Sequence, residues 1–320
     1  MFSFLKLIRF QNLIIIAFTQ YVVRWCLVYP ILKAQSSYYT LQLSEIQFFL
    51  LVLSTVMIAA AGHIINDYFD VRIDKVNKPE RLIIDNGVKR RIAMGAHVVI
   101  NILAFLIAIY VSYSIGAWKL ACIHFICASG LWYYSTTFKR QFLTGNIIIA
   151  VLTALVPVIV VVYELLPCYK AYLPLDENLT FKGAWVYVGG VAFFGFMTTL
   201  LHEIIKDIKN YEGDKEYGFK TMPVLIGIKA SKTIAVIIAA ATMVCLFLIQ
   251  LKLTDSLTFY YFTFALQIPF AFLIYKIAKA DTKKSFQTAG NITKIILLAG
   301  ISYLFVFAYT LLDFLHSHVK

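Results

Sequence analysis

The chain has 320 residues, of which 61% are hydrophobic and 14% are charged, and its mean hydropathy is +0.78. Soluble domains carry about 25% charged residues, so this composition excludes a soluble enzyme and is typical of a multi-pass membrane protein. The net charge of +12 does not indicate nucleic-acid binding, because the basic residues form short clusters between apolar segments. The five cysteines contain no CxxC pair, which argues against a zinc or disulfide framework.

We predict an all-α, multi-pass integral membrane bundle of about nine transmembrane helices around a central cavity that opens at the cytoplasmic side. A membrane-spanning helix needs about 20 predominantly apolar residues. The whole chain, residues 1–320, is expected to form a single membrane domain. In chain order, the predicted spans cover approximately residues 13–32, 46–65, 92–115, 120–134, 147–163, 185–201, 233–249, 257–277 and 295–314.

Basic residues predict the orientation of the chain. Of its 29 lysines and arginines, 22 fall on the side that holds the N-terminus and the connections after even-numbered spans. We therefore expect the N-terminus and the motif-bearing connections to be cytoplasmic. Arg24 lies inside the first predicted span, where a charge is costly. It either pairs within the bundle or extends to the membrane surface, and the sequence leaves both open.

The second predicted span runs directly into the stretch NDYFDVRIDKVNKPER, residues 66–81. If the helix continues through Asp74, one face carries a polar group at positions i, i+4 and i+8, namely Asn66, Asp70 and Asp74, with Asp67 one step round. Like charges at this spacing persist when a cation lies between them. Because Mg²⁺ is usually held by one or two carboxylates and substrate phosphates, the face predicts a magnesium-phosphate contact.

Cations lie beside this acidic face. Lys78 and Arg81 flank the carboxylates, and we expect them to contact phosphate rather than only to anchor the loop. After the fourth predicted span, the segment YYSTTFKRQFLTGN (133–146) places Lys139 and Arg140 at the same membrane face. The two segments together predict a site for a multiply charged anion.

A second acidic stretch, HEIIKDIKNYEGDKEYGFKTMP, covers residues 202–223 after the sixth predicted span. Its polar groups recur at steps of four, four and three, at Glu203, Asp207, Tyr211 and Asp214. This repeats the arrangement of the first motif. Two acidic faces predict two metal-phosphate contacts.

These features describe a site for a molecule with a phosphate head and a long hydrocarbon tail. Magnesium would bridge the carboxylates to a diphosphate and offset its charge as it leaves. With an allylic diphosphate, departure leaves a carbocation, which nearby tyrosine rings stabilise, and we assign this role to Tyr134 and Tyr211. The expected partners are thus a polyprenyl diphosphate, a hydrophobic acceptor with a hydroxyl or an electron-rich ring, and the lipid bilayer.

The first acidic stretch resembles the NDxxDxxxDxxNKPxR signature of the UbiA superfamily of intramembrane prenyltransferases, and DIKNYEGDKEYGFKTMP (207–223) resembles the second signature. The middle segment around Tyr134, Lys139 and Arg140 also matches the family, and the resemblance extends along essentially the whole chain. It implies that residues 1–320 form one UbiA-like domain with Mg²⁺-dependent transferase activity.

The resemblance also implies roles for individual residues. One metal-diphosphate contact would involve Asn66, Asp70 and Asp74. The other would involve Asp207 and Asp214, so the metal ligands would be the four aspartates with help from Asn66. The residues expected around the diphosphate are Asp67, Arg72, Lys78, Arg81, Lys139, Arg140 and Lys220.

Within the superfamily, residues 206–224 most resemble the branch that includes digeranylgeranylglyceryl phosphate synthase and chlorophyll synthase. The expected acceptor is therefore a prenylglycerol phosphate-like lipid precursor, with an aromatic quinone or chlorophyll-type precursor as the alternative. Asn210 and the segment 82–87 depart from the branch pattern, which affects the acceptor more than the metal chemistry. A transporter is a further alternative, but it predicts carboxylates near mid-span rather than at helix ends. The remaining interpretation is that the charged residues of the two motifs only solvate two loops.

Overall fold

The computed structural model describes residues 2–77, 83–176, 179–253 and 255–318. Over these residues the chain is helical apart from turns, connections and one isolated bridge between Ile84 and Val88. Eight of the described helices are long and apolar enough to cross a membrane. The predicted all-α integral membrane architecture is therefore confirmed.

The chain divides into two compact units, each built from segments that are separate in the sequence. The first unit consists of Met1–Phe18, Leu43–Leu152 and Asn210–Leu225. The second unit consists of Thr19–Gln42, Thr153–Lys209 and Ile226–Lys320. The expectation of a single domain over residues 1–320 stays a prediction.

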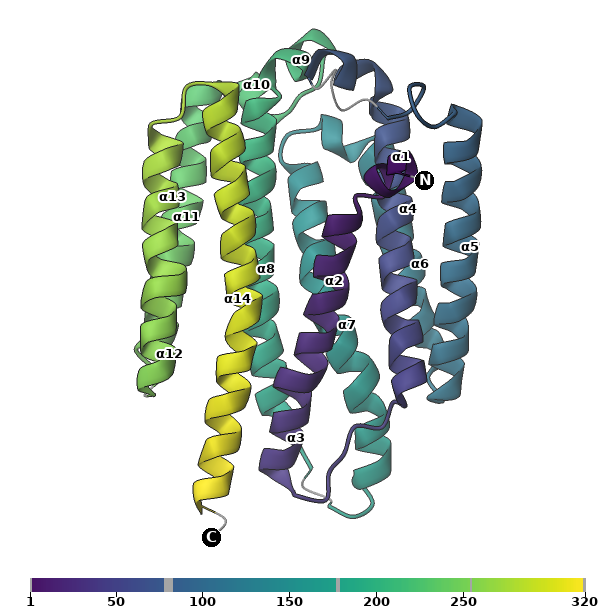
Figure 1. The fold of residues 1–320 in the computed structure, drawn as a ribbon, viewed down its shortest axis with the longest axis vertical. Helices are drawn as coiled ribbons and strands as arrows, with labels where there is room; N and C mark the ends of the chain where they lie inside the picture. The colour runs from purple at the N-terminus through teal and green to yellow at the C-terminus, as the bar shows by residue number, and fades with distance from the viewer. Residues whose placement is uncertain (1, 78–82, 177–178, 254, 319–320) are drawn as a thin grey trace. The chain divides into compact units, whose positions relative to one another are not determined.

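The first unit holds three long helices that pack against one another, α4 (Glu45–Asn77), α5 (Arg90–Ser114) and α6 (Ala121–Thr136). Figure 1 shows α4 and α5 side by side. Its shorter elements are α1 (Phe2–Leu7), η3 (Trp118–Leu120), η4 (Phe138–Arg140), α9 (Tyr211–Glu216) and most of α10 (Met222–Ile226). Two further helices, α2 (Phe10–Val23) and α7 (Thr144–Tyr172), contribute residues to both units.

The length of α4 explains how a membrane helix carries an acidic motif. Its 33 residues extend about 50 Å at 1.5 Å per residue, whereas the hydrocarbon core of a bilayer is about 30 Å thick. The helix therefore continues beyond the apolar layer, and its last three turns hold Asn66 to Asn77. The predicted continuation of this helix through Asp74 is confirmed.

The second unit is also helical. In chain order, its elements are η1 (Arg24–Val28), α3 (Tyr29–Gln35), α8 (Lys182–Lys209), α11 (Ile228–Gln250), α12 (Ser256–Tyr261), η5 (Phe262–Gln267), α13 (Ile268–Ala278) and α14 (Lys283–His318). Helix α14 packs along α8 and against α13, as Figure 1 shows. The approach to α8 requires glycine at Gly300, because a Cβ atom there would overlap the ring of Phe194.

Arg24 pairs inside the second unit. Its Nε lies 2.8 Å from Oε1 of Glu164, and the two side chains are 1% and 0% exposed. This decides between the two alternatives for Arg24 in favour of internal pairing. The span predicted at residues 147–163 ends just before Glu164, but α7 continues to Tyr172. The physical reason is that the ion pair neutralises Glu164, so the helix stays buried beyond the predicted end of the span.

The predicted spans match the observed helices closely in place. The segment expected at 120–134 is α6, which has 16 residues and is shorter than the eight candidate spans. The chain turns between α5 and η3 at Gly116, whose φ is 65°, a left-handed value that glycine adopts without strain. A count of nine spans and a cytoplasmic cavity remain predictions.

Candidate active site

The first acidic face lies on the last turns of α4, where a helical step of four places side chains above one another. Asn66 donates from Nδ2 to Oδ2 of Asp70 at 2.9 Å and lies 3.5 Å from Oδ1 of Asp67. The amide thus holds two carboxylates close together. Asp74 is partly buried one turn further along the same helix.

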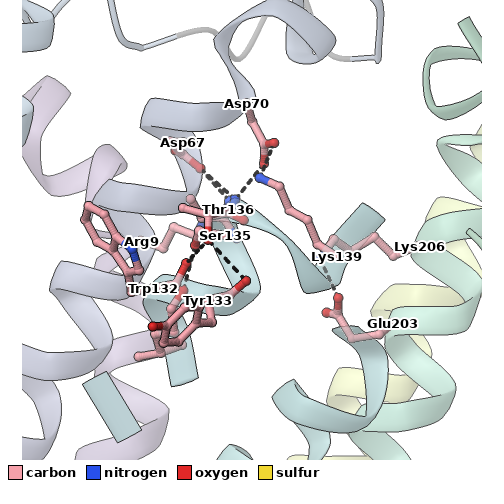
Figure 2. A network of polar contacts seen from close by, with 12 residues as sticks. Arg9, Asp67, Asp70, Trp132, Tyr133, Ser135, Thr136, Lys139, Glu203 and Lys206 are labelled. Atoms are coloured by element: carbon pink, nitrogen blue, oxygen red, sulfur yellow. Dashed lines mark hydrogen bonds and ion pairs between the residues drawn. The ribbon is translucent and has the colours of Figure 1, made fainter. Parts of the chain in front are cut away.

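Lys139 supplies a cation to this face. Its ammonium forms an ion pair and hydrogen bond with Oδ1 of Asp70, and the two side chains are 8% and 14% exposed. Figure 2 shows Lys139 and Asp70 pointing toward each other. The turn η4 that carries Lys139 needs glycine at Gly145, because a Cβ atom there would lie 2.7 Å from the Lys139 Cα atom. The observed pairing agrees with the placement expected for Lys139.

Arg9 is a site residue that was not predicted. Its NH2 atom donates to Oδ1 of Asp67 at 2.7 Å, as Figure 2 shows. Burial disfavours the charged guanidinium, but the carboxylate of Asp67, with smaller contributions from Tyr134 and Asp70, outweighs this effect and raises the pKa of Arg9. The guanidinium therefore remains charged beside the acidic motif.

The position of Arg9 follows from the packing of the chain start. Helix α1 ends at Leu7, which is buried in an apolar cluster with Ile64 and Val71 of α4. Arg9 then adopts a left-handed φ of 51° as the chain turns into α2. A left-handed φ is uncommon for a residue other than glycine, and such residues cluster at functional sites. The cluster fixes α1 against α4 and so brings the Arg9 side chain to Asp67.

The second motif differs locally from the expectation. A continuous helix face through Glu203, Asp207, Tyr211 and Asp214 was predicted, but α8 ends at Lys209 and α9 begins at Tyr211. Asn210 interrupts the helix with φ −94° and ψ 5°. Asp214 consequently lies on a separate short helix, where it is 5% exposed and its Oδ2 accepts a hydrogen bond from the Thr221 hydroxyl at 3.2 Å.

Backbone contacts bring three motif segments together within the first unit. The Gly213 N–H donates to Oδ1 of Asn77 at 3.2 Å, which joins the end of α4 to α9. The Lys220 N–H donates to the carbonyl of Arg140 at 2.8 Å, and the Arg140 guanidinium lies 5.2 Å from the centroid of the Phe219 ring. The ends of the first acidic motif, the Lys139–Arg140 turn and the Asp214 segment therefore form one connected layer.

The sequence matches the UbiA prenyltransferase family over residues 27–295. The chain belongs to this family. A digeranylgeranylglyceryl phosphate synthase of Thermococcus sibiricus is 30% identical over 255 residues, which cover 78% of this chain and 79% of the relative.

Solved structures show the same fold. A structure from work on digeranylgeranylglyceryl phosphate synthase in membranes superposes with a TM-score of 0.61 at 23% identity and covers 95% of this chain and 98% of that one. A UbiA homologue from Archaeoglobus fulgidus bound to GPP and Mg²⁺ superposes with a TM-score of 0.54 at 15% identity, covering 95% and 99%. These likenesses establish the UbiA fold for this chain.

The remaining predicted residues of this UbiA chain lie in several places. Tyr134 is buried and acts electrostatically on Arg9, which puts it beside the first acidic face. The Tyr211 ring lies 5.8 Å from the Lys215 ammonium. Arg72 is exposed on α4, two residues from Asp70, so it does not share the face of that carboxylate.

Asp207 is partly buried on α8 and belongs to the second unit, whereas Asp214 belongs to the first. Its shared role with Asp214 stays a prediction. Arg140 and Lys220 are exposed in the connected layer. Lys78 and Arg81 lie outside the described residues.

The carboxylates fit a magnesium ion that is completed by a substrate. Within the described ranges, no group of three or more His, Cys, Asp or Glu side chains comes together as a ready-made metal cage. Mg²⁺ keeps several waters and is usually bound through one or two carboxylates and substrate phosphates. The Asp70 carboxylate, to which Asn66 donates a 2.9 Å hydrogen bond, offers this kind of ligand.

Proposed function

We propose that this UbiA-family chain is a Mg²⁺-dependent prenyltransferase that transfers a polyprenyl group from an allylic polyprenyl diphosphate to a prenylglycerol phosphate-type lipid. Family membership supports the reaction class. The name of the Thermococcus sibiricus relative supports the acceptor, and the GPP and Mg²⁺ bound to the Archaeoglobus fulgidus homologue support the donor and the metal.

The observation that carries the proposal is the joining of the three motif segments. Asn77 contacts Gly213, and Arg140 contacts Lys220, although these pairs are 136 and 80 positions apart in the sequence. Carboxylates and cations that are distant along the chain thereby belong to one layer. Such a layer suits a diphosphate, which needs both a bridging metal and direct cationic contacts.

The acidic side chains have the role of holding the metal. Asp70, Asp74 and Asp214, with Asn66 beside Asp70, would ligate Mg²⁺, and Asp207 is proposed to assist. When bound, the ion neutralises the diphosphate and makes it a better leaving group. Asn66 keeps the Asp70 carboxylate oriented through its 2.9 Å hydrogen bond.

The basic side chains have the role of binding diphosphate oxygens. We assign this role to Lys139, Arg140 and Lys220, with Arg72, Lys78 and Arg81 as further contacts. The bond between the allylic carbon and the diphosphate oxygen breaks with its electron pair on the oxygen. We assign stabilisation of the resulting cation to the rings of Tyr134 and Tyr211. The acceptor hydroxyl then forms the new carbon–oxygen bond and loses its proton.

Asp70→Asn tests the proposed site directly. Purified protein with Mg²⁺, a polyprenyl diphosphate and a prenylglyceryl phosphate should form the diprenylated product, detected by mass spectrometry. The variant and EDTA should each abolish turnover, and added Mg²⁺ should restore only the EDTA-treated sample. Asp85→Asn is the matched control, because Asp85 is half exposed and lies 3.9 Å from Arg90 outside the motif layer. Full turnover with both Asp70→Asn and EDTA would dismiss the site.

A further inference from the structure

A stripe of basic residues on α8 is not used by the proposed chemistry. His202, Lys206 and Lys209 lie at i, i+4 and i+7, which places them on one face of the helix. Glu203 and Asp207 lie one position further round. The Lys206 ammonium contacts Oε2 of Glu203 at 2.5 Å, so the acidic neighbour offsets one of these charges.

Helix α14 presents a matching polar stripe to this face. Gln287, Asn291 and Lys294 also lie at i, i+4 and i+7. The Lys209 ammonium donates to Oε1 of Gln287 at 2.9 Å, and Nε2 of Gln287 donates to Oδ1 of Asn291 at 3.0 Å. We call the six residues of the two stripes the α8–α14 seam. They are His202, Lys206, Lys209, Gln287, Asn291 and Lys294.

Lys294 lies at the inner end of the seam. Nδ1 of His202 donates to the carbonyl of Gly290 at 3.1 Å. Lys294 follows Gly290 by four residues and so lies one turn further along the same face. Its charge acts on the His202 ring, as does that of Lys206, while the Lys294 side chain remains exposed. An anion can therefore reach a site that is lined by cations from two helices.

The neighbours of Lys294 on a second helix distinguish it from an anchoring lysine. Lysines at the cytoplasmic ends of helices, such as Lys209, satisfy the positive-inside rule and need no further explanation. Lys294 directly precedes the apolar part of α14 that was predicted to span the membrane, residues 295–314, and lies one turn beyond the contact between Gly290 and His202. A cation at this boundary, beside His202 and Lys206 of a second helix, has the position of an anion-binding residue rather than of a lone anchor.

We propose that the α8–α14 seam binds the phosphate of the lipid acceptor, a phosphate monoester carried by a prenylated glycerol. The identity of this ligand rests on the proposed function. Lysine ammonium groups form strong charge-assisted hydrogen bonds to phosphate, and the amides of Gln287 and Asn291 supply neutral donors beside them. A phosphate held where the apolar part of α14 begins suits a molecule whose remainder lies in the bilayer.

Binding measured without any prenyl diphosphate tests the proposal on the full chain in detergent. Wild-type protein should bind a prenylglyceryl phosphate about tenfold more tightly than the prenylglycerol that lacks the phosphate. Lys294→Met should remove about that tenfold advantage and leave the affinity for prenylglycerol unchanged. Lys294→Arg, which keeps the charge, should retain it. The control is Lys284→Met, an exposed position at the start of the same helix, which should bind as wild type does.

Equal affinity of wild type for the two lipids would overturn the proposal, as would equal weakening by Lys284→Met and Lys294→Met. Competition by inorganic phosphate that disappears in Lys294→Met would support it and would identify the phosphate as the recognised group.

Asp70→Asn separates this proposal from the proposed function, because this variant should lose transfer yet still bind the prenylglyceryl phosphate. If wild type transfers the prenyl group and Lys294→Met has an unchanged KM for the acceptor, the seam proposal is rejected while the proposed function stands.

Discussion

Arg9 connects the start of the chain to the first acidic motif. Its guanidinium contacts Asp67, and Asn66 links Asp67 to Asp70, so a change at Arg9 reaches two of the proposed site carboxylates. Hydrogen bonds to charged groups contribute about 1.5–3 kcal/mol each. Arg9 therefore has the position of a residue that orients the acidic face.

Arg9→Met should lower kcat/KM for prenyl transfer on the order of tenfold, because Asp67 loses its cationic partner and turns away from the acidic face. The measurement is steady-state transfer by purified protein. Lys6→Met is the matched control, since Lys6 is exposed on α1 and should leave kcat/KM unchanged. An Arg9→Met enzyme with wild-type kcat/KM would show that the Asp67 contact has no role in the reaction.

Single basic residues were the hardest part of the site to predict. Arg9 and Lys294 both stand near the cytoplasmic ends of predicted spans, where the positive-inside rule already accounts for a lysine or arginine. Only their tertiary contacts, with Asp67 and with the His202 region, distinguish them from anchoring residues. Lys139 was predicted because it occurs within a patterned segment rather than alone.

At the scale of elements, α9 and the end of α4 meet at a glycine. A Cβ atom on Gly213 would lie 2.5 Å from Oδ1 of Asn77, which accepts the Gly213 N–H. Gly213→Ala should destabilise the protein by about 1–3 kcal/mol through overpacking and should reduce turnover by displacing Asp214. Thermal unfolding in detergent and a transfer assay measure the two effects.

The matched control for this contact is a double-mutant cycle. Asn77→Ala removes the crowding atom at the cost of one hydrogen bond, so Gly213→Ala should cost less in the Asn77→Ala background than in wild type. If Gly213→Ala has the same effect in both backgrounds, the close approach to Asn77 is not the reason for glycine at this position.

The buried pair of Arg24 and Glu164 joins η1 to α7 inside the second unit. Removing one partner leaves an uncompensated buried charge, so Arg24→Met and Glu164→Leu should each cost about 3–5 kcal/mol of stability. The double variant leaves no such charge and should be more stable than either single variant. Unfolding of the three variants in detergent measures this. Additive destabilisation in the double variant would contradict the prediction.

The comparison of α4 with α8 shows what the sequence determines about elements. Helix α4 keeps a polar face in register from Asn66 to Asp74, and its continuation was predicted from that local spacing. The spacing from Glu203 to Asp214 looks equally regular, yet the chain breaks at Asn210. The break places Gly213 against Asn77, a contact between residues 136 positions apart that no local pattern encodes. The partner of Arg24 was unpredictable for the same reason.

At the scale of the whole molecule, the distribution of basic residues predicts which connections face the cytoplasm. In a variant whose five cysteines are replaced, Lys89→Cys should resist a membrane-impermeant maleimide in intact cells, and Lys252→Cys should react. Both positions are exposed in the structure, so access to the reagent depends on the side of the membrane. Permeabilised cells, in which both should react, provide the control. Labelling of Lys89→Cys in intact cells would reverse the orientation.

The part of α4 that extends beyond the hydrocarbon layer affects how the two products leave after each turnover. The diphosphate is released at the part of α4 outside the hydrocarbon layer, whereas the prenylated lipid remains in the bilayer. The two products thus partition into different phases. Recombination requires diphosphate to return from the aqueous phase to the end of α4, so dilution of the released diphosphate favours the forward direction.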